Sequence, residues 1–214
     1  MNDIESSDID IETDFIIAEC LHKCLIIDKI TKNKIILVTG AYGGIGSSIC
    51  KKFKSNGWHV IGTDIFNNRN NKYIDFYFKA DLTNSQDIKN MINTIKKKYN
   101  KLDCIINNAA SQICKPIWEM DENEWDLIFN CNLKSIYLIV KESLELLKDN
   151  NSNIINIGSV HSISTSDKIA AYATSKAAIV GLTRNLAIEL SKFNIRVNCV
   201  SPGAIDTKML RDGL

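Results

Sequence analysis

The stretch Thr39-Gly40-Ala41-Tyr42-Gly43-Gly44-Ile45-Gly46 decides how this chain folds. It follows an apolar run, residues 35–38, and precedes residues 47–53, which have the composition of the first turns of a helix. A buried strand, a glycine-rich turn and a helix N-terminus in that order form a cradle for phosphate groups. Glycine lets the backbone approach the ligand, and the helix start offers free amides and the positive end of its dipole. The stretch therefore predicts a dinucleotide-binding α/β domain.

The chain that follows alternates between strand and helix patterns. Strands are predicted at residues 35–38, 58–63, 74–78, 102–106, 153–157 and 195–200, and helices at 44–56, 88–99, 121–148 and 172–193. This alternation predicts a Rossmann-like doubly wound parallel sheet of six strands, in the order 3-2-1-4-5-6, with helices on both faces. Ligands bind beyond the carboxyl ends of the strands in such a sheet, and the candidate residues below fall at those ends.

Residues 34–214 are predicted to form this domain, and residues 1–33 an N-terminal extension. Six of the 25 acidic residues lie within residues 1–14, so the remaining chain carries 19 acidic against 26 basic residues, a net charge of +7. That charge is mild and forms no dense basic cluster with interleaved aromatics, which excludes nucleic acid as an expected partner. The acidic start predicts disorder. Residues 15–27 are apolar enough to pack on the domain or to dock a partner, and packing is favoured.

Seven cysteines, an odd number without the spacing of a disulfide framework, indicate reduced thiols in a cytoplasmic protein. Cys20 and Cys24 resemble part of a metal site, but no second pair of ligands stands at zinc spacing, so no metal is expected. No apolar run approaches the roughly 20 residues of a membrane span. The acidic start is also wrong for a secretory signal or a transit peptide.

Asp64 follows the second predicted strand, 24 residues after Gly40. A carboxylate there accepts hydrogen bonds from the hydroxyls of an adenosine ribose and repels a 2′-phosphate. An NADP site needs a nearby cation, and the loop offers only Tyr42 and Gly43 before Gly44. The sequence therefore favours NAD(H) over NADP(H). A solvated aspartate at a strand end is the plain structural alternative.

Two tyrosine–lysine pairs have a spacing of four residues, which places both members on one face of a helix. They are Tyr172 with Lys176 and Tyr137 with Lys141. The spacing alone does not distinguish the two pairs. Tyr137 lies inside an apolar helical pattern and is better explained as part of the core.

Ser159 favours the pair at Tyr172. It lies 13 residues before Tyr172 and directly after the strand predicted at residues 153–157, where ligands bind. A free phenol has a pKa of about 10, too high for a base near neutrality. Lys176 supplies a positive charge that favours the phenolate, and Ser159 can donate a hydrogen bond to a substrate oxygen as charge builds on it.

Together these motifs resemble the short-chain dehydrogenase/reductase family over about residues 34–210. Its glycine motif is carried by Thr39, Gly40, Gly44 and Gly46, and its Asn-Asn-Ala-Gly motif appears as Asn107-Asn108-Ala109-Ala110. The resemblance implies the catalytic set Ser159, Tyr172, Lys176 and Asn132, in which Asn132 holds a water that links Lys176 to solvent. The cofactor contacts that it implies are Gly40, Tyr42, Gly44, Ile45, Gly46, Asp64, Asp81, Leu82, Asn108, Ala109, Tyr172, Lys176, Pro202, Gly203, Ile205 and Thr207.

By this resemblance the chain is an NAD(H)-dependent oxidoreductase that interconverts a secondary alcohol and a ketone, and a homo-oligomer. A sugar or polyol and a 3-oxoacyl thioester both stay open as substrates; Asp64 favours the former, because acyl reductases usually use NADPH. A non-catalytic dinucleotide-binding protein is a rival of a different class. An epimerase or dehydratase of the extended relatives is disfavoured, because Gly40, Gly44 and Gly46 follow the shorter group's spacing.

The chain ends at Leu214, 11 residues after Gly203, where the family normally continues into a substrate lid and a seventh strand. We therefore expect the sixth strand to be an edge and the pocket to have no lid, in either a fragment or a shortened protein. The candidate pocket residues are Ser111, Gln112, His161, Ser164 and Ile169. Their mixed polarity leaves the substrate unassigned.

Overall fold

The computed structural model describes residues 34–67 and 70–212. The predictions for residues 1–33, including those for Cys20 and Cys24, lie outside the described residues. Within the described ranges, no group of three or more His, Cys, Asp or Glu side chains could hold a metal ion. No helix in the same part of the chain combines the length and apolar character needed to cross a membrane.

Six parallel strands form one sheet. They are β1 (Ile35–Thr39), β2 (His59–Asp64), β3 (Phe76–Lys79), β4 (Cys104–Asn107), β5 (Asn153–Ile157) and β6 (Arg196–Val200). They are hydrogen-bonded in the order β3-β2-β1-β4-β5-β6, and every pairing is parallel. The predicted doubly wound architecture and strand order are confirmed. The direction of winding reverses between β1 and β4, which creates the crevice in which such sheets bind ligands.

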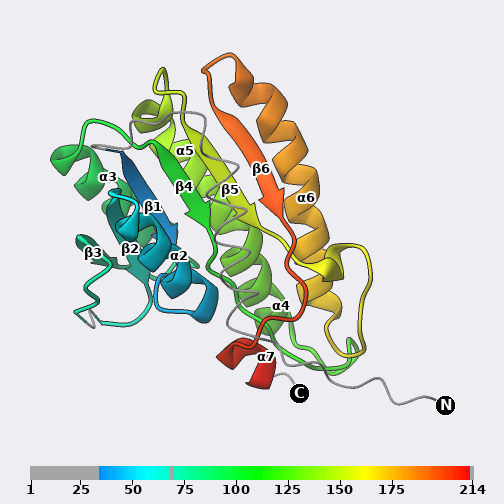
Figure 1. Ribbon diagram of the computed structural model, residues 1–214. Helices are drawn as coiled ribbons and strands as arrows, with labels where there is room; N and C mark the ends of the chain where they lie inside the picture. The colour runs from blue at the N-terminus through cyan, green and yellow to red at the C-terminus, as the bar shows by residue number, and fades with distance from the viewer. Residues whose placement is uncertain (1–33, 68–69, 213–214) are drawn as a thin grey trace, which may run out of the picture.

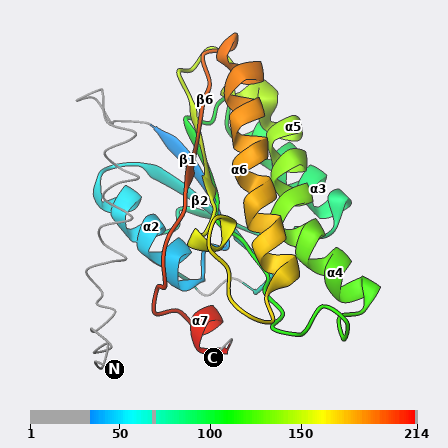
Figure 2. The ribbon, with the colours of Figure 1, turned by 90° about the vertical axis from the view of Figure 1, so that its right-hand side faces the viewer.

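Helices cover both faces of the sheet. They are α2 (Gly44–Ser55), α3 (Ser85–Lys98), α4 (Glu122–Phe129), α5 (Ser135–Leu147), α6 (Ala170–Ser191) and α7 (Lys208–Asp212). Helices α3, α5 and α6 lie on one face, and α2 lies on the other (Figure 1 and Figure 2). Alternate strand residues point to different cores: Ile105 and Ile154 pack toward the three helices, whereas Ile106 and Ile155 belong to the core on the α2 side. Strands buried on both faces are rich in apolar residues, and β1 and β4 follow this pattern up to the polar residue that ends each of them.

Local sequence sets where several helices begin. The side chain of Asn84 accepts a hydrogen bond from the Gln86 amide at 2.8 Å and caps α3. Asp121 and Glu124 form a capping box at the start of α4, in which each side chain accepts from the other's backbone amide, at 2.9 and 3.0 Å. No side chain caps α2, which starts directly after the glycine-rich turn. Its first amides therefore face the position predicted for a phosphate.

The helical stretch predicted at residues 121–148 is divided in the structure. A π-helical turn, Asn130–Lys134, joins α4 to α5, and Asn132 lies inside it. Its hydrogen bonds span five residues instead of four, so one extra residue is inserted into the helix. Hydrophobic periodicity does not reveal such a turn, because the apolar face continues on either side of it. The short helix α7 was also not predicted.

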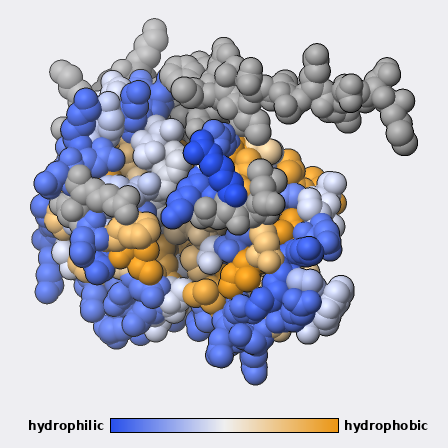
Figure 3. Space-filling view, turned by 90° about the horizontal axis from the view of Figure 1, so that it is seen from below, coloured by the Kyte–Doolittle hydropathy of each residue, from blue (hydrophilic) through white to orange (hydrophobic). Residues whose placement is uncertain are grey.

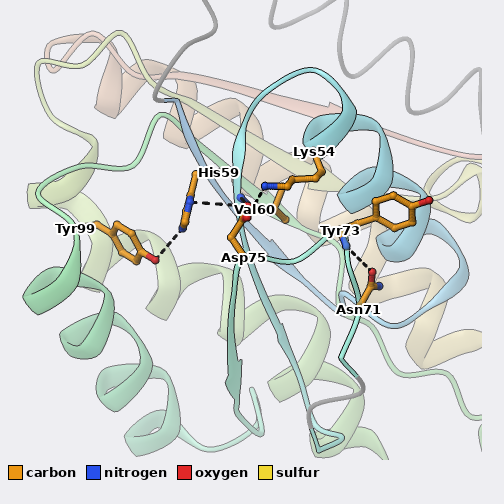
Figure 4. A network of polar contacts seen from close by, with 7 residues as sticks. All are labelled: Lys54, His59, Val60, Asn71, Tyr73, Asp75 and Tyr99. Carbon is orange, nitrogen blue, oxygen red and sulfur yellow. Dashed lines mark hydrogen bonds and ion pairs between the residues drawn. The ribbon is translucent and has the colours of Figure 1, made fainter.

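A polar network ties the amino ends of β2 and β3 to neighbouring helices (Figure 4). Asp75, just before β3, accepts a hydrogen bond from the Val60 amide at 2.8 Å and pairs with Lys54 of α2. Its carboxylate lies 3.8 Å from Nδ1 of His59, whose Nε2 lies 2.8 Å from the Tyr99 hydroxyl at the end of α3. Burial lowers the pKa of His59, and the Asp75 charge opposes that shift. The network therefore holds a neutral imidazole near pH 7, at the end of the sheet away from the candidate site.

Ile49 of α2 tests the assignment of the core on the α2 side. It is 1% exposed, whereas Ile188 of α6 is 75% exposed. We predict that Ile49→Ala lowers the free energy of unfolding by about 2–5 kcal/mol, because removal of a buried side chain leaves a cavity. The matched change Ile188→Ala should alter it by less than about 0.5 kcal/mol. Urea unfolding followed by circular dichroism measures both, and equal losses would contradict the assigned core.

Candidate active site

The glycine-rich turn is fixed to the end of the neighbouring strand β4. The Thr39 hydroxyl accepts hydrogen bonds from the amides of Asn108 and Ala109 at 2.9 and 3.0 Å. In return, the side-chain amide of Asn108 donates to the carbonyls of Thr39 and Gly40 at 3.0 and 3.1 Å. The ends of β1 and β4 are therefore joined where the winding of the sheet reverses. Hydrogen bonds within the chain set the position of the turn.

Three glycines of this turn have no room for a side chain. Gly40 has a φ of +62°, and a Cβ there would lie 2.9 Å from the Cα of Ala109. A Cβ at Gly46 would lie 2.0 Å from the Gly40 oxygen, and one at Gly44 would lie 2.7 Å from Cγ2 of Thr207. The ends of β1 and β6 thus converge at Gly44. A bare backbone at an uncapped helix start is what a pyrophosphate requires, so these residues fit a dinucleotide.

Asp64 ends β2 beside the turn, as the sequence predicted. Its two carboxylate oxygens accept hydrogen bonds from the amides of Tyr42 and Ile65, at 2.9 and 2.8 Å. The Tyr42 ring stacks on Tyr77 with centroids 5.0 Å apart, and the Tyr77 hydroxyl donates to the Asp64 carbonyl at 3.0 Å. Each carboxylate oxygen can accept a further hydrogen bond. Asp64 is therefore held in place with acceptor capacity left for ribose hydroxyls.

Ser159 and Tyr172 meet at the carboxyl end of β5. Ser159 follows that strand, Tyr172 lies in the first turn of α6, and the Ser159 hydroxyl is near enough to the phenol to influence its pKa. The Ser159 hydroxyl also accepts from the His161 amide at 3.1 Å. Burial raises the pKa of Tyr172, and the nearby Ser159 hydroxyl opposes that shift. The side chain is therefore a neutral phenol at neutral pH, on the same side of the molecule as the serine.

Lys176 lies one turn after Tyr172 and is 2% exposed. Its Nζ donates to the Ile157 carbonyl at 2.7 Å and lies 5.5 Å from the centroid of the Tyr172 ring. Burial lowers the pKa of Lys176 to about 8, so the ammonium form still dominates at pH 7. The expected preference of Tyr172 for the phenolate is not found in the chain alone, because burial of the phenol outweighs the opposing influence.

Asn132 is buried within the π-helical turn. Its Oδ1 accepts from the Ser111 amide at 2.7 Å, and its Nδ2 donates to the Ser111 carbonyl and to the Ser175 hydroxyl, both at 3.0 Å. Ser175 in turn donates to the Tyr172 carbonyl at 2.7 Å. Asn132 thus connects the segment after β4 to the first turn of α6. One lone pair of its Oδ1 remains for a further contact.

The predicted cofactor residues after β1, β3 and β4 differ in their contacts and in how far their side chains are buried. Asp81 accepts hydrogen bonds from the amide and hydroxyl of Thr83, at 2.9 and 2.7 Å. The Leu82 side chain is buried in the core beneath α3 and α5. Ala109 and Ile45 are half-buried, on either side of the turn. All four predicted residues follow the carboxyl ends of strands.

The segment after β6 approaches the other strand ends. The Pro202 carbonyl accepts from the Val160 amide at 2.9 Å, which joins this segment to the one that carries Ser159. Gly203 faces open space, whereas Ile205 is buried. Thr207 lies against Gly44. The structure therefore brings the predicted contacts of β1, β5 and β6 to one end of the sheet.

The candidate pocket residues lie on two adjoining loops, which are joined by a hydrogen bond from the Lys115 amide to the Lys168 carbonyl at 2.7 Å. The His161 ring lies edge-on to Tyr172, with centroids 6.3 Å apart, and its Nδ1 lies 3.1 Å from the Ser164 carbonyl. Ser111 is held by Asn132, Gln112 donates to Cys114, and Ile169 is buried at the start of α6.

Large apolar side chains are exposed at this end of the sheet. They include Trp118 and Ile163 on the two loops and Ile65 and Phe66 after β2. Figure 3, which looks onto the carboxyl ends of the strands, shows hydrophobic residues in patches around the middle of this face with hydrophilic residues toward the rim. Such exposure suits a surface that contacts a ligand.

Sequence reasoning missed several residues that position the site. Thr39 was assigned only to the glycine motif, although its hydroxyl joins two strands. Ser175, which links Asn132 to Tyr172, was not singled out at all. A serine inside a helix carries no distinctive pattern. Its position one residue before Lys176, on the buried side of α6, is the signal that could have identified it.

Comparison with known proteins agrees with this geometry. The family model described as short chain dehydrogenase matches residues 34–213. A 3-oxoacyl-[acyl-carrier-protein] reductase of Thermotoga maritima is 32% identical over 189 residues, covering 83% of this chain and 76% of the relative. An NAD-dependent glycerol dehydrogenase of Listeria innocua is 32% identical over 184 residues, covering 83% and 72%.

Solved structures show the same relationship. Ligand-free aldohexose dehydrogenase of Thermoplasma acidophilum matches with a TM-score of 0.79 and 32% identity, over 85% of this chain and 71% of that one. A 4-hydroxyisoleucine dehydrogenase complexed with NADH matches with a TM-score of 0.78 and 32% identity, over 84% and 77%.

The chain belongs to the short-chain dehydrogenase family. It is therefore an oxidoreductase that acts on a CH–OH or keto group with a nicotinamide dinucleotide. The resemblance seen in the sequence is confirmed at the level of family, fold and enzyme class. Short-chain dehydrogenase relatives include both acyl reductases and polyol dehydrogenases, so membership alone selects neither substrate.

Burial of the Lys176 ammonium predicts how the free energy of unfolding of this short-chain dehydrogenase depends on pH. Its pKa is lowered to about 8, so between about pH 8 and 10.5 the unfolded chain binds more protons than the folded one. The contribution of Lys176 to the free energy of unfolding therefore rises with pH across that window, by on the order of 2 kcal/mol. Lys176→Met removes the titrating group. In urea unfolding from pH 7 to 10, the free energy of unfolding of the variant should fall relative to that of the unaltered chain as the pH rises. A difference between the two that does not change with pH would contradict the lowered pKa of Lys176.

Proposed function

We propose that this chain is an NAD(H)-dependent oxidoreductase that interconverts a secondary alcohol and a ketone, with Ser159, Tyr172, Lys176 and Asn132 as its catalytic set. The observation that carries the proposal is that Ser159, Tyr172 and the buried Lys176 lie together: the Ser159 hydroxyl is near enough to lower the pKa of Tyr172, and Nζ of Lys176 lies 5.5 Å from the centroid of the Tyr172 ring. These groups lie at the end of the sheet that also holds the glycine turn and Asp64.

Bound NAD(H) supplies or accepts the hydride and, when oxidised, brings a positive charge. In the direction of reduction, Ser159 donates a hydrogen bond to the carbonyl oxygen, and Tyr172 gives its proton to that oxygen as negative charge builds on it. The raised pKa of Tyr172 suits an acid that must remain protonated until then. The Lys176 ammonium, 5.5 Å from the ring centroid, stabilises the phenolate that is left. Oxidation of the alcohol runs through the same groups in reverse.

Asn132 would act in this scheme by holding the water that returns a proton to the Lys176 side. Its side chain is anchored by Ser111 and Ser175 and keeps one lone pair free. The other cofactor contacts that we propose are those of the glycine turn, Asp81 and Leu82 after β3, Asn108 and Ala109 after β4, and Pro202 to Thr207 after β6.

Asp64 supports NAD(H) as the preferred cofactor. Its carboxylate lies beside the glycine turn and accepts from the Tyr42 and Ile65 amides, and no lysine or arginine among the described residues pairs with it to offset repulsion of a 2′-phosphate. An NAD-dependent glycerol dehydrogenase and an aldohexose dehydrogenase among the relatives support a polyol or sugar as substrate. The second candidate, reduction of a 3-oxoacyl thioester with NADPH, is favoured by the acyl-carrier-protein reductases among them.

The expected partners and compartment belong to this proposal. A small-molecule substrate and a second copy of the chain are the partners that we propose. Five cysteines in the described ranges (Cys50, Cys104, Cys114, Cys131 and Cys199) are free thiols, which suits a reducing compartment such as the cytoplasm.

Tyr172→Phe tests the catalytic assignment. We predict that it lowers turnover by at least about 10³-fold with every carbonyl in a panel of ketoses, simple ketones and 3-oxoacyl thioesters, because the proton donor is lost. NADH affinity, measured by fluorescence titration, should stay within about twofold, since only a hydroxyl is removed. The expectation that Tyr137 belongs to the core was wrong, because its side chain is 48% exposed on the outer side of α5. The matched control is therefore Tyr137→Phe in this second pair with Lys141, which should leave turnover unchanged. Normal turnover by Tyr172→Phe would refute the role, and no turnover by the unaltered chain would favour the non-catalytic rival.

Asp64→Ala tests the cofactor preference. Loss of the carboxylate should weaken NADH binding and strengthen NADPH binding, shifting the ratio of their Kd values by roughly 10- to 100-fold, or about 1.4–2.8 kcal/mol. Asp126→Ala, at an exposed position on α4, is the control and should leave the ratio unaltered. A ratio that stays constant in both variants would show that Asp64 does not select the cofactor.

A further inference from the structure

The segment that follows β2 is held by hydrogen bonds to its backbone. The two residues after Asp64, Ile65 and Phe66, have side chains that are 54% and 51% exposed, so burial does little to fix them. Their backbone is held from β3, the parallel neighbour of β2. The Tyr77 hydroxyl of β3 shares its proton between two carbonyl oxygens, that of Asp64 at 3.0 Å and that of Phe66. The segment therefore curls around one phenol.

A single peptide unit connects Tyr77 to the carboxylate of Asp64. The Asp64 carbonyl and the Ile65 amide belong to one planar unit, which is trans like every peptide bond among the described residues. In this form the C=O and N–H point in opposite directions. The carbonyl accepts from the Tyr77 hydroxyl and the Ala80 amide, both at 3.0 Å. The amide donates to Oδ1 of Asp64 at 2.8 Å. The phenol thus holds this amide toward the carboxylate.

The ring of Tyr77 acts on the second amide that holds the carboxylate. The Tyr42 amide donates to Oδ2 of Asp64 at 2.9 Å. The Tyr42 ring stacks on that of Tyr77, with centroids 5.0 Å apart and an angle of 27° between the planes. Such stacking stabilises one position of both rings and of the residues that carry them. Both hydrogen bonds that orient the Asp64 carboxylate therefore depend on Tyr77, one through its hydroxyl and the other through its ring.

We propose that Tyr77 is a positioning residue that sets the preference for NAD(H). This inference rests on the proposed function, in which Asp64 binds the adenosine ribose. A carboxylate held by two amides presents its remaining lone pairs in fixed directions, which suits a pair of ribose hydroxyls, and it cannot turn away from a 2′-phosphate. A carboxylate released from one amide can rotate. It then binds the hydroxyls less tightly and repels the phosphate less, so loss of Tyr77 weakens discrimination between the two cofactors.

Fluorescence titration of the folded variants with NADH and NADPH tests this role without reference to turnover. Tyr77→Phe removes the hydroxyl and keeps the ring. It should lower the ratio of the NADPH Kd to the NADH Kd by about 3- to 10-fold, the equivalent of one hydrogen bond. Tyr77→Leu also removes the stacked ring and should lower the ratio further, toward the value in Asp64→Ala.

Tyr99→Phe is the matched control. The Tyr99 hydroxyl lies 2.8 Å from Nε2 of His59, at the end of the sheet away from the candidate site. This variant therefore loses a comparable hydrogen bond and should keep the ratio of the unaltered chain. A shift in Tyr99→Phe as large as that in Tyr77→Phe would overturn the proposal, because any loss of a tyrosine hydroxyl would then have the same effect.

A double variant separates positioning of Asp64 from other effects of Tyr77. In Asp64→Ala there is no carboxylate to orient, so adding Tyr77→Phe should leave the ratio as it is in Asp64→Ala alone. A further shift of the same size as in the unaltered background would overturn the proposal. An unchanged ratio in Tyr77→Phe, with a clear shift in Asp64→Ala, would overturn it and leave the proposed function intact. A ratio that Asp64→Ala does not change would overturn both this role and the assignment of Asp64.

Discussion

The junction between β1 and β4 is the constraint on which the rest of this structure depends. Four hydrogen bonds cross it: the Thr39 hydroxyl accepts from the amides of Asn108 and Ala109, and the Asn108 side chain donates to the carbonyls of Thr39 and Gly40. These bonds fix a turn that no side chain could enter. Because the winding of the sheet reverses at this junction, the loops that follow the strands on either side of it line the same crevice. Asp64 lies on one side of the crevice, and Ser159, Tyr172 and the segment after β6 lie on the other.

The chemistry of the candidate site follows from how deeply these groups are buried. Burial raises the pKa of Tyr172 and lowers that of Lys176 to about 8, so the lysine gives up a proton more readily than the phenol does. In the proposed mechanism this order suits a lysine that restores the proton of Tyr172 after the phenol has protonated the substrate. Ser159 adds a hydroxyl that touches Tyr172 and can turn to a substrate oxygen.

Much of this arrangement could be predicted from sequence, for identifiable physical reasons. The glycine turn requires residues without Cβ, so its position shows in the sequence, and alternation of apolar strands and amphipathic helices sets the strand order. Asp64 and Ser159 were found because both directly follow strands. The π-helical turn at Asn132 was not, since inserting one residue leaves the apolar face continuous. The direction of the Tyr172 pKa was also missed, because burial of the phenol depends on packing by distant residues.

The proposed function depends on one arrangement: a dinucleotide that extends from Asp64, across the glycine turn, to a nicotinamide ring that faces the hydroxyls of Tyr172 and Ser159. A crystal structure of the full chain with NADH measures it most directly. The account predicts the adenosine ribose on the Asp64 carboxylate, the pyrophosphate on the first amides of α2, and the nicotinamide ring beside both hydroxyls. A dinucleotide bound elsewhere, or a nicotinamide ring out of reach of Tyr172, would contradict it.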